Sequence, residues 1–293
     1  MSHMHHVAFN SFWVSSPLIF VCGVYLRGWL RLRRPGHDSL AGWRAGSFVL
    51  GLLFIWVATA SPLATLDHQT LTVHMVQHLL LMTLAPPLIL LGMPVNPLAH
   101  GLSPGFVEVI GRPFRWEPIQ QLGSALTHPA VCWLGAANTL LVWHIPTLFM
   151  LGLRSGVWHG IMQASFLTSG LLFWWPVFHP RSGSLLRPEW WILLYLFLAS
   201  LPCDILSGFL VFCDRVVYTV FLSSSTPFGL SALEDQQCAG ALMWTCVTVV
   251  YLIAGTIFTA CLLSPHRSEE QSILRFEPQR VSVDTEPQRI EAV

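Results

Sequence analysis

Lysine is absent from the sequence, and charged residues of any kind are scarce. All 15 basic residues are arginine, 15 acidic residues balance them, and charged residues fill only 10% of the 293 positions, against about 25% in an ordinary soluble domain. The lack of lysine excludes a P-loop nucleotide site, a pyridoxal-phosphate Schiff base and a retinal linkage, because each needs a lysine amine. The scarcity of charge excludes a typical soluble enzyme, a disordered regulator and a fibrous protein, and a net charge of zero offers no basic surface to nucleic acid.

Apolar residues are abundant instead. They make up 53% of the chain and gather in runs long enough to cross a bilayer, which takes about 20 residues for about 30 Å of hydrocarbon. In lipid, runs of this length satisfy their backbone groups only as helices. The sequence therefore predicts an all-α, polytopic membrane protein with seven transmembrane helices, at approximately Ser16–Leu30, Ala45–Thr59, His74–Leu91, Pro129–Leu151, Val157–Phe178, Trp190–Phe212 and Ala239–Leu263.

The positions of the arginines predict the orientation. With the N-terminus outside, thirteen arginines fall on the cytoplasmic side and only Arg154 and Arg215 fall outside, which is a strong positive-inside bias. We therefore expect an N-terminus outside the cytoplasm and a cytoplasmic C-terminus. The chain would then consist of an extracytoplasmic N-terminal segment (1–15), a seven-helix transmembrane domain (16–263) and a mobile cytoplasmic tail (264–293) that is charged and poor in large apolar residues.

Histidine is present in 13 copies, and four of them share one predicted depth near the outer face. His74 and His78 begin the third span one turn apart, so both lie on one helical face. His144 lies near the outer end of the fourth span and His159 at the outer start of the fifth. A single histidine in a membrane helix can simply be hydrogen-bonded to a neighbouring helix, but four at one depth predict a shared metal ion at the outer face.

The chemistry of the ligands predicts the metal. Imidazole binds copper, zinc, iron and nickel, whereas a thioether selects the softer Cu(I). Met75 and Met82 accompany the histidines on the third span as further candidate ligands, and Asp67 and His68 in the preceding outer loop could complete the ligand set or orient an imidazole. Asp235, just before the seventh span, either caps that helix or hydrogen-bonds around the histidines. We therefore predict copper, as Cu(I), at this site.

A set of motifs runs in a fixed order over most of residues 60–250: His74–Leu81, Ala85–Leu88, Leu91–Pro94, Trp143–Pro146, Gly170–Val177, Asp235–Gln237, Ala239–Gly240 and Met243–Trp244. Together these stretches resemble the signature of the caa3-type cytochrome c oxidase assembly factor family, the CtaG family of bacterial membrane proteins. By motif position, the resemblance carries over as functional residues His74, His78, His144, His159 and Asp235. The segment around Cys203 and Asp204 departs from the family pattern, so the resemblance assigns these two residues no role.

The resemblance implies a multi-pass protein of the bacterial inner (cytoplasmic) membrane that is needed to assemble a haem–copper terminal oxidase. It implies a part in copper supply, with an oxidase subunit and a copper donor protein as partners. We expect the protein to be no enzyme: it would bind copper at the outer histidines and pass it on by ligand exchange. Ligands that both capture and release the ion suit this role better than a closed thiolate cage.

Two alternatives stay open at the level of the sequence. One is a b-type haem or quinone-linked membrane electron carrier, because membrane haems use pairs of histidines from two spans at one depth, and His78 with His144 could serve. The other is a metal-free membrane chaperone that holds an oxidase subunit during insertion, with the histidines acting as hydrogen-bonded packing groups.

Overall fold

The computed structural model describes residues 2–33, 42–179, 190–223 and 229–263, with the side chains of residues 2–11 and 223 excepted. The tail that the sequence predicts to be mobile (264–293) lies outside these residues. The described chain is helical and contains no strand. Its α-helices are α1 Ser2–Leu32, α2 Gly42–Ala60, α3 Leu71–Leu79, α4 Ala85–Leu91, α5 Val95–Gly101, α6 Pro104–Phe114, α7 Glu117–Leu126, α8 Pro129–Trp143, α9 Pro146–Arg154, α10 Gly156–Phe178, α11 Trp190–Phe212 and α12 Ala232–Leu263.

The helices confirm an all-α protein with several membrane-spanning segments. Six segments of the described chain are long and apolar enough to cross a bilayer, and a seventh is reached if the bent pair α7 and α8 counts as one span. The axes of α7 and α8 differ by 65°. The structure therefore supports six spans and at most seven, and the side of the membrane on which each end lies stays a prediction.

The fourth predicted span, Pro129–Leu151, consists of two helices that are separated just beyond His144, where Ile145 and Pro146 end the first of them. α8 ends at Trp143, His144 caps it, and α9 begins at Pro146. Proline has no N–H to continue the helix, and it keeps the residue before it extended, as the ψ angle of 123° at Ile145 shows. The 15 residues of α8 rise only about 22 Å, so this helix stops short of a full crossing and leaves His144 at its end.

The central rod of the fold consists of α3, a π-helical turn at Leu80–Leu84, and α4. It is the most deeply buried of the candidate spans, and it packs against α2, α10 and α12. The π turn lies just before Pro86 and Pro87, which cannot donate the backbone hydrogen bonds of a regular α-helix. Gly170 of α10 lies against this turn so closely that a Cβ atom there would be 2.6 Å from the carbonyl oxygen of Met82.

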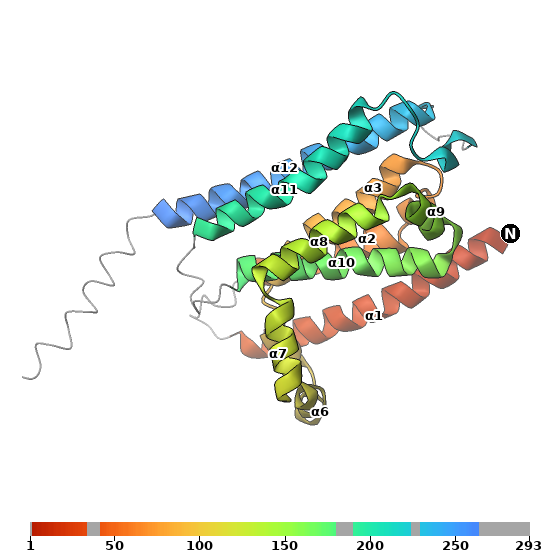
Figure 1. Cartoon of the computed structure of the whole chain (residues 1–293). Coiled ribbons are helices and arrows are strands. Elements are labelled where there is room, and N and C mark those ends of the chain that lie inside the picture. The colour runs from red at the N-terminus through yellow and green to blue at the C-terminus, as the bar shows by residue number, and fades with distance from the viewer. Residues whose placement is uncertain (1, 34–41, 180–189, 224–228, 264–293) are drawn as a thin grey trace, which may run out of the picture.

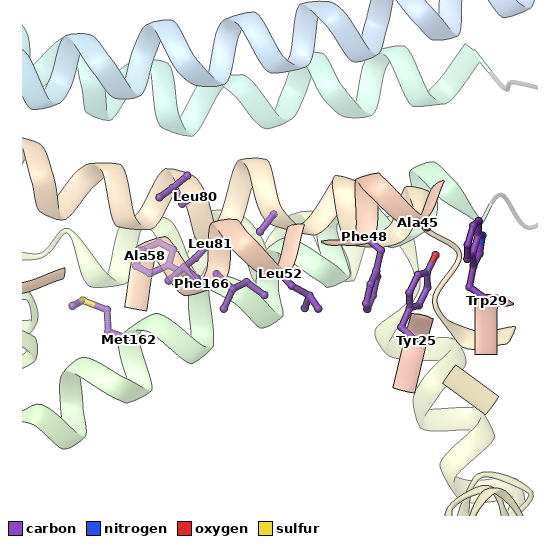
Figure 2. Packing of buried hydrophobic residues seen from close by; sticks show 12 residues of the cluster. Tyr25, Trp29, Ala45, Phe48, Leu52, Ala58, Leu80, Leu81, Met162 and Phe166 are labelled. Atoms are coloured by element: carbon purple, nitrogen blue, oxygen red, sulfur yellow. The ribbon is translucent and has the colours of Figure 1, made fainter. Parts of the chain in front are cut away.

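Buried apolar side chains fix the helices around this rod. In the cluster shown in Figure 2, residues of α1, α2, the π turn and α10 interlock, and Tyr25 stacks on Phe48 with ring centroids 3.8 Å apart. The Tyr25 hydroxyl also donates to the carbonyl of Gly92 at 2.8 Å. Two further clusters join α3, α9, α11 and α12, and α4, α8, α10 and α11. The core therefore holds each of the histidine-bearing helices in place.

The two ends of the bundle differ in composition. The C-terminal end of α1 and the short helices α6 and α7 lie at one end, and the start of α3, α9 and the α11–α12 connection lie at the other (Figure 1). The first end carries Arg27, Arg31, Arg33, Arg44, Arg112 and Arg115, whereas the second carries Arg154 and Arg215. The four predicted histidines all lie toward the arginine-poor end, on α3, after α8 and on α10. We call this the outer end, following the predicted orientation.

Candidate functional site

The site begins with the way α3 is anchored. Asp235 of α12 is 1% exposed, and its carboxylate accepts hydrogen bonds from the backbone N–H groups of Leu71 at 2.6 Å and Thr72 at 3.2 Å. Its carbonyl oxygen accepts a third bond, from the Thr72 hydroxyl. A carboxylate at a helix N-terminus satisfies free N–H groups and favours the helix dipole. Asp235 therefore caps α3, the helix that carries two of the histidines.

Asp235 was expected either to cap its own helix or to hydrogen-bond around the histidines, and the structure shows a third arrangement. Glu234 does the local capping of α12: its carboxylate accepts from the backbone N–H and the hydroxyl of Ser231, both at 2.8 Å. This is the reciprocal pattern of a capping box. Asp235 is thereby left free to hold a different helix.

His74 and His78 point at each other from successive turns of α3. Their Nε2 atoms are 2.8 Å apart, so one nitrogen donates a proton and the other accepts it. Phe149 packs edge-on against His74 at 4.9 Å between ring centroids, and Phe166 stacks on His78 at 4.0 Å. Both imidazoles are buried, and neither Nδ1 atom has a hydrogen-bond partner among the described residues. The pair is held by aromatic walls and keeps unused nitrogen atoms.

His159 forms a second group with the loop before α3. Its Nε2 is 3.3 Å from one carboxylate oxygen of Asp67, and Nε2 of His68 is 3.5 Å from the other. The side chain of Asp67 is 3% exposed, that of His159 12%, and that of His68 55%. One candidate ligand atom from each of the three residues lies within 4.8 Å of the others, and this is the only such trio in the described chain. The group therefore reaches solvent through His68.

Burial and a neighbouring amide affect the Asp67, His68 and His159 group. Burial raises the pKa of the Asp67 carboxyl, and the two imidazoles oppose this effect when they are protonated. The side-chain amide nitrogen of Gln163, one turn along α10, is 2.8 Å from Nε2 of His159. Sequence reasoning missed Gln163, although its spacing of four residues from His159 places both on one helical face.

His144 is positioned by the end of α8. Its Nδ1–H donates to the carbonyl of Leu140 at 2.7 Å, which fixes the ring and leaves Nε2 as a free lone pair. That Nε2 is buried without a partner among the described residues. The hydroxyl of Tyr218 donates to the backbone carbonyl of His144 at 2.9 Å, so the α11–α12 connection also holds this residue. A fixed ring with a bare nitrogen is the usual state of a histidine ready to bind a metal.

The structure brings all four predicted histidines together as a row. The row begins with His68, which precedes the four. The distances between the ring centroids of successive members are 5.6 Å for His68–His159, 5.8 Å for His159–His74, 4.4 Å for His74–His78 and 6.4 Å for His78–His144. Two imidazoles bound to one ion by bonds of about 2 Å have centroids up to about 6 Å apart. Neighbours in the row are therefore at or near the distance for sharing an ion. This differs from the single four-histidine centre expected from the sequence, because His159 contacts His74 whereas His144 contacts His78.

The two candidate methionines lie beside the row and are not part of it. Met75 is fully buried and Met82 belongs to the π turn. Both line a cavity of about 40 Å³ whose wall also includes His78 and His144.

Comparison with known proteins assigns the family. A sequence model described as cytochrome c oxidase caa3 assembly factor (Caa3_CtaG) matches residues 23–271. An uncharacterized protein of Mycobacterium leprae is 24% identical over 261 residues, which cover 84% of this chain and 39% of the relative. Uncharacterized proteins of Mycobacterium bovis and Mycobacterium tuberculosis are each 28% identical over 247 residues, which cover 80% of this chain and 36% of the relative.

The chain thus spans less than two fifths of the length of these curated relatives. No solved structure matches it. The family match covers every helix that carries a residue of the histidine row. The chain therefore belongs to the family of cytochrome c oxidase caa3 assembly factors.

Proposed function

We propose that the protein supplies copper to a haem–copper oxidase during assembly of the oxidase in the bacterial inner membrane. Copper would arrive at the outer end from a donor protein, bind along the row of imidazoles, and be passed to an oxidase subunit. The observation that carries the proposal is the unbroken row from the exposed His68 to the buried His144. Nothing is converted chemically, because transfer by ligand exchange makes and breaks only metal–ligand bonds.

The Asp67, His68 and His159 group is the proposed point of uptake. It has the only solvent-exposed member of the row, and its three ligand atoms already lie within 4.8 Å of one another. A carboxylate beside two imidazoles attracts a cation and orients the rings. An ion held there needs only a small movement to reach His74, whose ring is the next neighbour of His159.

The His74 and His78 pair is the proposed holding site. Two nitrogens bound to one copper ion at about 2 Å would lie about 3–4 Å apart, slightly farther than the 2.8 Å between their Nε2 atoms. A small rotation of either ring would therefore admit the metal between the two Nε2 atoms, and the proton of the donating Nε2 would move to the free Nδ1 of the same ring. A site with nitrogen ligands alone binds Cu(I) less firmly than a thiolate cage does, which suits delivery.

A haem bridging His78 and His144 is less consistent with the geometry. A porphyrin would have to lie between the two rings, but the space beside them amounts to about 40 Å³, enough for only a few water-sized groups. Phe166 also lies flat on His78. A bare ion fits this space and a macrocycle does not. A Soret band in the purified protein would reverse this conclusion.

The unpaired ring nitrogens of the histidine row bear on the alternative that the protein is a metal-free chaperone. Buried polar atoms in folded proteins nearly always have partners, yet one nitrogen each of His74, His78 and His144 has none among the described residues. Histidines that serve only as packing groups would be expected to use both nitrogens. A metal ion bound by Nε2 of His144 explains why that atom is left free.

The test is anaerobic Cu(I) titration of the full-length protein in detergent. We expect the double variant H74A/H78A to lose at least one bound equivalent of copper, whereas the control H128A should bind as the wild type does. His128 is an exposed histidine at the opposite end of α8, where its ring caps the helix. Equal copper stoichiometry and affinity in H74A/H78A and the wild type, with both proteins folded, would reject copper binding at the row.

A further inference from the structure

The cavity beyond the histidine row is unusually rich in sulfur. It lies between the central rod and α8, α10, α11 and α12, and its wall contains Met75, Met82, Met243 and Cys203 together with His78 and His144. The sulfur-bearing residues come from three separate elements: α3 with its π turn, α11 and α12. Three of the eight methionines of the chain therefore meet at one small space.

The histidines in the wall offer free nitrogens at this place. Nε2 of His144 and Nδ1 of His78 are both buried without a partner among the described residues. The proton of the His144 ring is on Nδ1, which donates it to the carbonyl of Leu140. Nε2 therefore carries no proton and can only accept a hydrogen bond or bind a metal. An unpaired acceptor in a space of low dielectric is costly unless something binds to it.

Packing alone does not account for this arrangement. Methionine is flexible and normally fills irregular gaps in a core. Here three methionines surround a space of about 40 Å³ and leave it open, although Met75 and Met243 are almost fully buried. The π turn that carries Met82 is held in register by the close approach of Gly170, and π turns are frequent at functional sites. The geometry keeps a small hole open beside soft ligands.

We propose that this cavity is a second, sulfur-containing Cu(I) site, which receives the ion from the His74 and His78 pair. His144 supplies the nitrogen ligand, and the thioethers of Met82, Met243 and Met75 supply sulfur. Thioethers favour Cu(I) over Cu(II) and Zn²⁺, so the cavity selects the reduced ion. The ion changes ligands but not oxidation state, and no proton has to leave a thioether. The inference rests on the proposed function, because the ion reaches the cavity through the row.

His78 connects the two sites. It belongs to the pair on α3, and it also lines the cavity. An ion therefore passes from the pair to His144 and the thioethers without leaving the neighbourhood of the His78 ring. The path therefore leads from a site with nitrogen ligands alone to one that adds sulfur, so that affinity for Cu(I) increases along it.

The experiment uses full-length protein in detergent under anaerobic conditions, with Cu(I) as the probe and a Cu(I) chelator as competitor. Copper X-ray absorption spectra report whether sulfur is bound. In the wild type we expect sulfur ligands in the spectrum. In M82L/M243L, which leaves Met75 as the one thioether of the cavity, we expect a weaker sulfur signal and at least a tenfold weaker affinity for the tightest-bound Cu(I). Leucine conserves the volume of methionine closely enough to keep the fold.

The matched control is M162L. Met162 is fully buried in another cluster and does not line the cavity, so its replacement should leave the spectrum and the affinity unchanged. A wild-type spectrum without sulfur, or an M82L/M243L variant that binds as the wild type does, would overturn the second site. In that case H74A/H78A would still lose copper if the proposed function is correct. Wild-type protein that binds no Cu(I) at all would overturn both.

Discussion

Replacing Asp235 with alanine is expected to loosen the helix that carries His74 and His78. The carboxylate accepts two backbone N–H bonds at the start of α3, at 2.6 and 3.2 Å, and is 1% exposed. Hydrogen bonds to a charged acceptor contribute about 1.5–3 kcal/mol each, and the buried donors would be left unpaired. With partial replacement by water, we expect a loss of about 2–4 kcal/mol in the free energy of unfolding.

The measurement is thermal unfolding in detergent together with Cu(I) affinity. A loss of that size lowers the midpoint of unfolding by about 5–15 °C in a protein of this length, and D235N should fall between the wild type and D235A because the amide keeps one acceptor oxygen. The matched control is E234A, which removes a neighbouring carboxylate that caps only its own helix. If D235A lowered neither the midpoint nor the Cu(I) affinity more than E234A does, the anchoring of α3 by Asp235 would be refuted.

Two other substitutions test the surroundings of the site. G170A should lower the unfolding midpoint and weaken Cu(I) binding, because its Cβ would meet Met82 backbone atoms at 2.6 and 2.9 Å. The control G160A, whose Cβ would have nothing within 4 Å, should change neither quantity. Equal unfolding midpoints for the two variants would contradict the close packing of Gly170 against Met82. D67N should stabilise the metal-free protein at neutral pH, because burial raises the pKa of Asp67 and makes its ionised form costly. Asp67 is protonated below about pH 4 in both the folded and the unfolded state, so the stability advantage of D67N over the wild type should shrink as the pH falls toward that value. Denaturant titrations at several pH values measure the difference in the free energy of unfolding between the two proteins. A difference that stays constant or grows as the pH falls would contradict the prediction.

Much of the fold follows from the sequence alone. Long apolar runs with few charges have only one way to satisfy their backbone in lipid, so helices and their approximate limits are predictable. The break after His144 is also predictable in position, since Pro146 cannot continue α8. The effect of this break on the number of spans is not predictable, because whether the 15-residue helix α8 counts as a span depends on its angle to α7. That angle is set by packing between segments far apart in the chain.

The candidate site divides in the same way. Spacing of four residues fixes His74 and His78 on one face of α3, and no tertiary information is needed for that. The partner of Asp235, 164 residues away at Leu71, has no local signal, and neither does the meeting of Met243 with Met82 at one cavity. The order of the histidines as a row, and the sulfur beyond it, were decided only by the packing of separate helices, because side chains from different segments acquire a common neighbourhood only when the helices dock.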